Sequence, residues 1–242
     1  MSMNDTRLQL NADLGEGCGN DAAIMPFIDA ANIACGGHAG NADSIEQTIA
    51  LAIPYSIALG AHPSFPDKAG FGRQNMQLSQ SELSDAIGEQ LQLIERVAQS
   101  LGVQLSHIKP HGALYNQASS DSQLADQLLD IFAEFNPMLS VVGLAGGELV
   151  KRGAARGLAT LSEGFADRRY QANGQLAARG QPHAVIENPA EAIAQVNQIL
   201  RSGTVTAIDN STVTLLCDTL CLHGDGAKAI EFAQQVAQIV KS

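Results

Sequence analysis

The sequence has no tryptophan, and aromatic residues make up only 4% of its 242 residues. Hydrophobic residues make up 45% and charged residues 16%, a balance typical of a folded chain rather than a disordered one. Because small and aliphatic side chains supply most of the apolar volume, the composition favours packed helices and strands over an all-β sandwich. A chain of this length buries one sizeable core and is short for two, so we expect a single domain over residues 1–242.

Positive charge is scarce as well, since 14 Lys and Arg stand against 25 Asp and Glu and the formal net charge is -11. We therefore expect no binding to nucleic acid or to an anionic membrane surface. No run of 18 apolar residues occurs, and the sequence predicts no membrane span. The four cysteines form no C-x-x-C pair and no signal peptide is recognisable, which predicts reduced thiols in a cytoplasmic protein.

Three common catalytic motifs are missing from the sequence. No G-x-x-x-x-G-K-[ST] occurs, and the glycine-rich GLAGGEL (143–149) lacks the lysine, which excludes a P-loop nucleotide site. GGHAG (36–40) does not match the Rossmann fingerprint, and no G-x-S-x-G nucleophile elbow is present. Any catalytic site therefore depends on where individual polar residues lie, not on one of these motifs.

Seven short apolar runs end in glycines and polar residues, as strands do where they lead into loops. They are LQLNAD (8–13), ANIACGGH (31–38), SIALGAH (56–62), SHIKPHG (106–112), LSVVGLAGG (139–147), LATLSEGFAD (158–167) and TLCLHGDG (219–226). Two further strand candidates near the end, TVTAID (204–209) and TVTLLCD (212–218), have no clear position in this order.

Helical patterns fill the gaps between these runs. The clearest covers 82–101, where apolar residues recur every three or four positions after the capping-box spacing Ser79–Glu82. Ser120–Gln123 repeats that spacing, and Asn188-Pro189 predicts an N-cap followed by proline in the first turn. Alternating strands and helices indicate a parallel sheet of the α/β class, and about seven such units fit a closed β/α barrel. A doubly wound open sheet is the alternative.

Polar and charged side chains gather where the predicted strands end. The carboxyl ends of all strands of a β/α barrel meet on one face, so these side chains are expected around one cavity. His107 is the exception, because we expect it to pack inside the strand rather than reach the cavity. The side chains at the strand ends are Asn11, Asp13, His38, His62, Lys109, His111, Glu163, Asp167, His223 and Asp225.

Several of these residue types suit acid–base chemistry. Asp13 and Glu16 could share general acid and base work, with a solvated turn as the alternative. Lys109 could stabilise a developing oxyanion, with a surface salt bridge as the alternative. Asp13, His38 and His62 also form a candidate ligand set for a divalent metal such as zinc or manganese, and the residues leave open whether a metal is required.

A long loop, HPSFPDKAGFGRQNMQLS (62–79), follows the third predicted strand. Long loops on that face of a barrel commonly shape a substrate pocket. Arg73 within it could bind a carboxylate or a phosphate. Its prolines and glycines could equally serve only to make the loop rigid.

Seven motifs together resemble the LamB/YcsF family, in the same order and over about residues 8–240. They are LNADLGEGCGND, ANIACGGHAGN, GAHPSFPD, FGR, KPHGALYN, FADRRYQ and CLHGDG. The resemblance implies a β/α barrel akin to polysaccharide deacetylases. It also implies opening of 5-oxo-L-proline to L-glutamate coupled to hydrolysis of ATP to ADP and phosphate, together with 5-oxoprolinase subunits B and C.

On this basis we predict two groups of functional residues around the barrel mouth. We assign catalysis to Asp13, Glu16, His38, His62, Lys109 and His111, and substrate binding to Asn11, Arg73, Tyr115, Asp167, Arg168 and His223. Two other functions remain open at this point: a metal-dependent amidohydrolase or deacetylase that acts alone, and a non-catalytic scaffold subunit.

Overall fold

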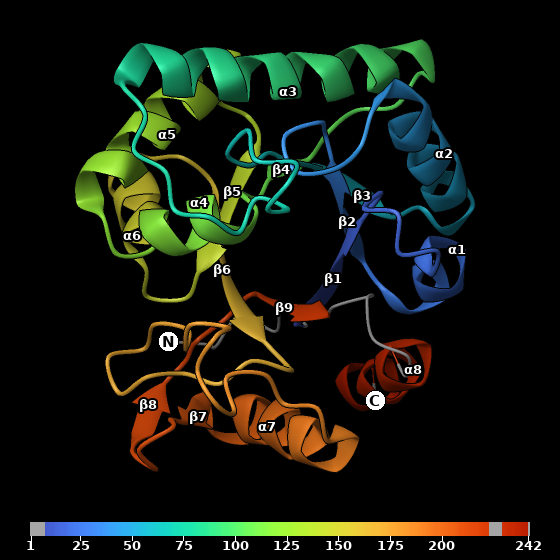
Figure 1. Ribbon diagram of the computed structural model, residues 1–242. Helices are drawn as coiled ribbons and strands as arrows, with labels where there is room; N and C mark the ends of the chain where they lie inside the picture. Colours follow the sequence, from blue (N-terminus) through green and yellow to red (C-terminus); the bar gives the residue numbers. More distant parts are fainter. Residues whose placement is uncertain (1–7, 223–228, 242) are drawn as a thin grey trace.

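Seven parallel strands close into a barrel in this computed structural model, which describes residues 8–222 and 229–241 (Figure 1). Their order around the barrel is β1, β2, β3, β4, β5, β6 and β9, with β9 paired to both β6 and β1. The strands are β1 Gln9–Leu14, β2 Ala30–Ala34, β3 Ala58–His62, β4 His107–Ile108, β5 Ser140–Leu144, β6 Thr160–Phe165 and β9 Thr219–Leu222. The predicted closed barrel is confirmed, and the open sheet is excluded.

Helices surround the barrel on its outside (Figure 1). They are α1 Asp21–Ile24, α2 Ala42–Ala52, α3 Gln80–Ser100, α4 Gly112–Ala118, α5 Ser122–Phe135, α6 Glu148–Ala155, α7 Pro189–Ser202 and α8 Ala229–Val240, with short 3₁₀ turns η1 Met25–Phe27 and η2 Ile53–Tyr55. Among the described residues, no helix combines the length and the apolar character that crossing a membrane requires.

Two of the three predicted helix N-caps are confirmed, and one is wrong. Helix α3 begins at the predicted capping box, in which Ser79 and Glu82 bond each other's backbone N–H. Helix α7 begins after Asn188, whose side chain accepts from the N–H of Ala190. The predicted box Ser120–Gln123 is wrong, because Asp121 caps α5 and accepts from two backbone N–H groups. A carboxylate one residue later satisfies both donors better than a serine hydroxyl.

The two predicted strands near the end of the chain, 204–209 and 212–218, do not join the barrel. Residues Thr204–Thr206 (β7) and Thr212–Thr214 (β8) form a separate antiparallel pair. The chain from 215 to 218 then leads into β9, so the predicted run 212–218 is only partly a strand.

Alternation along the strands sends polar residues into the barrel and apolar residues outward. On β1 the fully or nearly fully buried Leu10, Ala12 and Leu14 alternate with the polar Asn11 and Asp13. His107 and Lys109 likewise lie two residues apart, with the apolar Ile108 between them. The barrel interior is therefore lined by polar side chains, which must find partners there because little water reaches them.

Close packing in this interior depends on glycine at one position of β3. A Cβ on Gly60 would lie 2.0 Å from Nε2 of His107, so the imidazole occupies the space that any other side chain would need. The predicted structural role of His107 is consistent with this packing.

Candidate active site

A cavity of about 440 Å³ opens at the carboxyl ends of the barrel strands. The strand ends contribute Asp13, Glu16, His62, Lys109 and His111 to its lining. The other walls come from the loop 62–79, from the first part of α4 and from the segment that follows β6. A second, smaller cavity of about 220 Å³ lies at the opposite end of the barrel, among the residues at which the strands begin.

A buried lysine forms the floor of the larger cavity. Nζ of Lys109 lies 2.8 Å from Oδ1 of Asp13 and 2.8 Å from Oε1 of Glu163. It also lies 3.2 Å from Oδ1 of Asn11 and 3.3 Å from Sγ of Cys221. Burial works against the charge of this amine, but the neighbouring carboxylates and thiol outweigh burial and hold the pKa of Lys109 well above its usual value. The lysine is therefore a fixed positive charge beneath the cavity.

Glu163 on β6 is a functional candidate to which sequence reasoning assigned no role. It is fully buried, and it faces both Lys109 and Tyr115. Burial, reinforced by the charge of Glu163, raises the pKa of the Tyr115 phenol well above its usual value. An acidic residue within an apolar strand was the available signal, because a buried carboxylate needs a cation partner.

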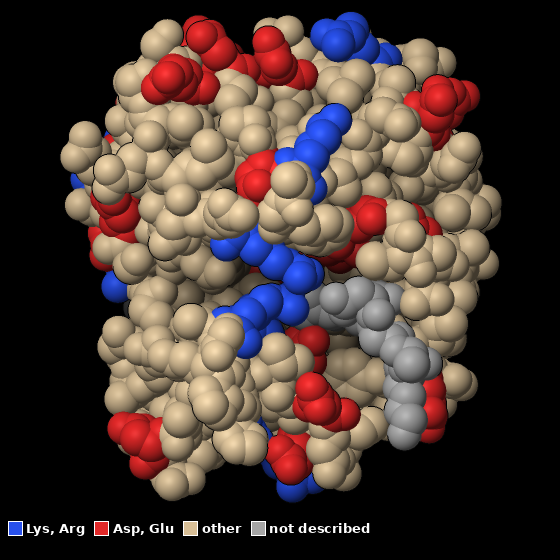
Figure 2. All heavy atoms as spheres, viewed as in Figure 1, with Lys and Arg blue, Asp and Glu red and all other residues tan. Residues whose placement is uncertain are grey.

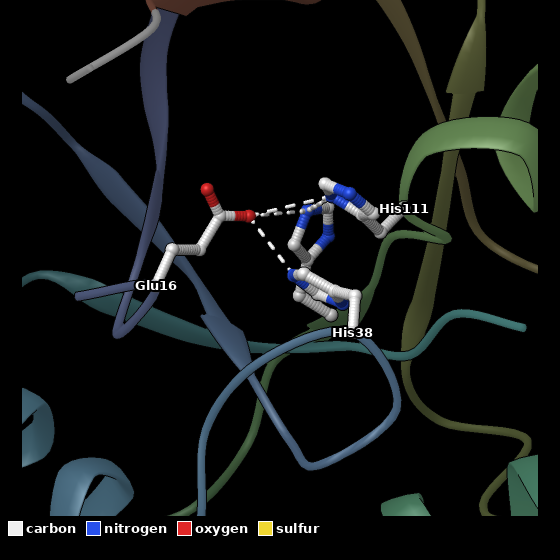
Figure 3. A group of neighbouring side chains, drawn as sticks. Glu16, His38 and His111 are labelled. Atoms are coloured by element: carbon white, nitrogen blue, oxygen red, sulfur yellow. Dashed lines mark hydrogen bonds and ion pairs between the residues drawn. The ribbon is translucent and has the colours of Figure 1, made fainter. Parts of the chain in front are cut away.

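Three histidines and a glutamate form a cluster beside the lysine (Figure 3). Nε2 of His38 lies 3.0 Å from Oε1 of Glu16, and Nδ1 of His111 lies 3.3 Å from the same oxygen. His62 completes the group, with its Nε2 atom 3.0 Å from Nδ1 of His111 and 3.4 Å from Oδ2 of Asp13. Burial is the main cause of a lowered pKa for both His38 and His111, which favours neutral rings.

The ligand atoms of Glu16, His38, His62 and His111 all lie within 4.8 Å of one another, so this group could hold a metal ion. The set shares His38 and His62 with the predicted trio. Glu16 and His111 take the place predicted for Asp13, whose Oδ1 atom is bound to Lys109. Neutral imidazoles and a carboxylate suit divalent metals of the zinc or manganese kind.

The loop 62–79 approaches the cluster closely because Gly72 lacks a side chain. A Cβ at Gly72 would lie 2.9 Å from the ring of His111 and 2.9 Å from Cβ of His38, and its φ of 64° also favours glycine. The backbone oxygen of Phe71 then bonds Nε2 of His111 at 3.0 Å. The loop therefore helps to orient the histidines, in addition to lining the cavity.

His107 lies apart from the cluster, deeper in the barrel. Its Nε2 atom bonds Oδ1 of Asn32 at 2.8 Å, and its Nδ1 atom bonds the hydroxyl of Ser106 at 2.8 Å. Burial and the nearby charge of Lys109 lower the pKa of His107 to about 3. It lines the second cavity and does not line the first.

Arginines gather at the mouth of the cavity. Arg73, Arg168 and Arg179 all contribute to its lining, and Figure 2 shows Lys and Arg side chains around a hollow on this face. Arg73 stacks over the ring of Phe71 at 4.9 Å, and Arg168 donates to the backbone oxygen of Ala177 at 2.6 Å. Burial, followed by the charge of Arg179, lowers the pKa of Arg168 to about 10. Guanidinium groups that line one cavity favour an anion within it.

Three of the predicted substrate-binding residues are not placed in this lining. Asn11 lies beneath Lys109 and lines the second cavity. Asp167 is not among the lining residues, and its backbone oxygen accepts from the N–H of Ile186. His223 lies outside the described residues. Arg179, which is part of the lining, was missed because nothing in its sequence surroundings places it beside Arg168.

Comparisons with a family model, with related sequences and with a solved structure agree with one another. The model of the LamB/YcsF family matches residues 8–242. A relative from Neisseria meningitidis serogroup A, which bears the name of the A subunit of 5-oxoprolinase, is 44% identical over 96% of this chain and 95% of its own. The identically named protein from Methylococcus capsulatus is 46% identical over 95% and 90%. The crystal structure of the lactam utilization protein from Thermus thermophilus superposes with a TM-score of 0.88 at 36% identity, covering 97% of this chain and 96% of that one.

The charge balance around Lys109 predicts a large loss of stability when the amine is removed. Lys109→Met leaves Asp13 and Glu163 without their shared cation, and we expect the free energy of unfolding to fall by about 3–5 kcal/mol. The double variant Lys109→Met/Glu163→Gln should recover at least about 1 kcal/mol of this loss, because it removes the fully buried one of the two negative charges. Urea denaturation of both variants and of Glu163→Gln measures the difference. Equal stability of the single and double variants would contradict this account of the ion pair.

Proposed function

The chain belongs to the LamB/YcsF family, and from that premise we propose that it is the A subunit of an ATP-dependent 5-oxoprolinase. In this reaction the lactam ring of 5-oxo-L-proline is opened to L-glutamate while ATP is hydrolysed to ADP and phosphate. The observation that carries the proposal is the name of that A subunit on relatives that are 43–46% identical over 95–96% of this chain. The size of the cavity, about 440 Å³, suits a small ligand of this kind.

The lactam is a resonance-stabilised amide, so its carbonyl carbon is a poor electrophile. Transfer of a phosphoryl group from ATP to the amide oxygen would remove that resonance. One water would then add to the ring carbon, the carbon–nitrogen bond would break, and the nitrogen would take up a proton. A second water would release the phosphoryl group as phosphate. General acid and base groups are needed for the proton transfers, and a fixed cation is needed near the oxygen.

The floor of the cavity supports this assignment of roles. Lys109 supplies the fixed cation, which would offset negative charge on the substrate oxygen. Asp13 and Glu16 both line the cavity, and one of them would take the proton of the attacking water. The buried Tyr115 phenol, whose pKa is raised, stays protonated and can donate a hydrogen bond.

The mouth of the cavity supports binding of the substrate carboxylate. 5-Oxo-L-proline carries one negative charge, and Arg73 and Arg168 both line the cavity. A guanidinium binds a carboxylate through two parallel hydrogen bonds, which fixes orientation as well as charge. Arg73 is the better candidate, because the guanidinium of Arg168 already bonds the backbone of Ala177.

ATP is the co-substrate in this proposal, and subunits B and C are the partners. The absence of a P-loop motif from the sequence is consistent with nucleotide handling that involves one of those partners. A divalent metal is a further candidate cofactor, at the histidine cluster rather than at the lysine. We place the reaction in the cytoplasm, where ATP is available and thiols stay reduced.

The proposal predicts that activity depends on ATP and on the partner subunits. The purified chain alone should turn over 5-oxo-L-proline poorly, and the chain combined with subunits B and C should release glutamate and phosphate together. A coupled assay of glutamate and phosphate, with and without each component, measures this. Turnover by the chain alone without ATP would instead support a metal-dependent amidohydrolase. Full activity of subunits B and C without this chain would show that the chain is not catalytic.

Binding of the carboxylate by Arg73 predicts a substrate-dependent effect of one substitution. In the assembled complex, Arg73→Gln should raise KM for 5-oxo-L-proline by at least about tenfold, since a charge-assisted pair is lost. The same substitution should leave the rate measured with 2-pyrrolidinone, the lactam without a carboxylate, nearly unchanged. Arg201→Gln on α7, whose exposed side chain does not line the cavity, is the matched control. Equal losses with both substrates would show that Arg73 does not bind the carboxylate.

A further inference from the structure

Two backbone carbonyls fix which ring nitrogen of His62 and of His111 donates a hydrogen bond. Nδ1 of His62 lies 2.8 Å from the backbone oxygen of Lys109, and Nε2 of His111 lies 3.0 Å from the backbone oxygen of Phe71. A carbonyl oxygen can only accept, so each of these ring nitrogens must carry the hydrogen. In a neutral imidazole the other nitrogen then presents a lone pair. In the neutral form of both rings, Nε2 of His62 and Nδ1 of His111 are therefore the nitrogens with a free lone pair, which is the form in which an imidazole ligates a metal.

These two acceptor nitrogens face each other at 3.0 Å. The atoms around them are acceptors too, because Oε1 of Glu16 lies 3.3 Å from the His111 nitrogen and 3.8 Å from the His62 nitrogen. Oδ2 of Asp13 lies 3.4 Å from the His62 nitrogen. Within residues 8–222 and 229–241, the polar contacts of the two nitrogens are with other acceptors. Lone pairs gathered in this way repel one another unless a cation lies between them.

The geometry points to a divalent metal ion, and we propose that it binds to Nε2 of His62, Nδ1 of His111 and the carboxylate of Glu16. Metal–nitrogen bonds of zinc are about 2.0–2.1 Å long, which puts two ligand nitrogens about 2.9 Å apart at a right angle and about 3.3 Å apart in a tetrahedron. The observed 3.0 Å lies within that range. The donor set of two imidazoles and a carboxylate suits zinc, manganese or iron rather than calcium or magnesium.

His38 has a different role in this site, although it belongs to the same cluster. Its ring stacks on His111 with centroids 3.6 Å apart and planes within 2° (Figure 3). A metal lies close to the plane of an imidazole that ligates it, and two parallel planes at this separation cannot both contain the same ion. Nε2 of His38 instead lies 3.0 Å from Oε1 of Glu16 and donates to it. His38 is therefore a positioning residue that holds the carboxylate ligand in place.

Three protein ligands leave the remaining coordination positions open. His62, His111 and Glu16 all line the larger cavity, so those positions face the space that a substrate or water would occupy. Sites with three protein ligands and an open position are typical of catalytic rather than structural metals. The inference does not depend on the proposed reaction, because metal binding can be measured without turnover.

The test is a metal titration of the purified full-length chain. Bound metal is removed with a chelator, and Zn²⁺ or Mn²⁺ is then titrated back and followed by calorimetry and elemental analysis. We expect one equivalent of at least one of these ions per chain. Titration with Co²⁺ should give the visible absorption of a nitrogen–oxygen site, and this readout needs no substitution. Failure of wild-type chain to bind any of the three ions at one equivalent would overturn the proposal.

Substitutions separate ligands from neighbours. His62→Ala and His111→Ala should each weaken binding at least about 100-fold, whereas His38→Ala should keep one equivalent and weaken binding about 10–100-fold. His107→Gln is the matched control, as a buried histidine outside the cluster, and should bind as wild type does. Thermal unfolding of each variant checks folding. Unchanged binding in folded His62→Ala and His111→Ala, or loss of the site in His38→Ala alone, would contradict the assigned ligands.

Discussion

The structure depends on a positive charge buried at the centre of a barrel. The Lys109 side chain is 2% exposed, and its charge is sustained by Asp13 and Glu163, which reach it from β1 and β6. Breaking such a pair leaves an uncompensated charge in a medium that solvates it poorly. The backbone oxygen of the same lysine orients His62. One residue therefore joins the charged floor of the cavity to the histidine cluster beside it.

A neutral layer lies directly beneath this charged layer. Asn11 and Asn32 bond each other, and Asn32 also bonds the ring of His107. Burial and the charge of Lys109 lower the pKa of His107 to about 3, so this ring adds no second positive charge. The same two-residue period that brings Lys109 to the cavity places His107 one layer lower. His107 and His111, four residues apart in the chain, therefore lie in different environments: His107 in the neutral layer and His111 in the cluster beside the cavity.

Local sequence pattern was sufficient to predict the barrel and to predict that the site lies at the carboxyl ends of its strands. Both predictions rest on features that act over a few residues, namely the alternation of strands and helices and the capping of helices. Local pattern could not predict that Glu163 pairs with Lys109, or that Arg179 lies near Arg168. Those contacts join segments that only the closed barrel and its loops bring together. Asn11 was expected at the cavity, yet its position two residues before Asp13 puts it one layer deeper. The hydrogen positions on His62 and His111 also required the structure, since distant carbonyls set them.

The central claim is that the charged layer and the cluster beside it carry the chemistry, whereas the neutral layer supports the fold. Steady-state kinetics of the assembled complex with ATP and 5-oxo-L-proline test it most directly. Lys109→Ala and His111→Ala should each reduce kcat/KM at least about tenfold, equivalent to about 1.4 kcal/mol of transition-state stabilisation. His107→Gln should reduce it far less. A folded His107→Gln variant as impaired as the other two would contradict this division of the barrel.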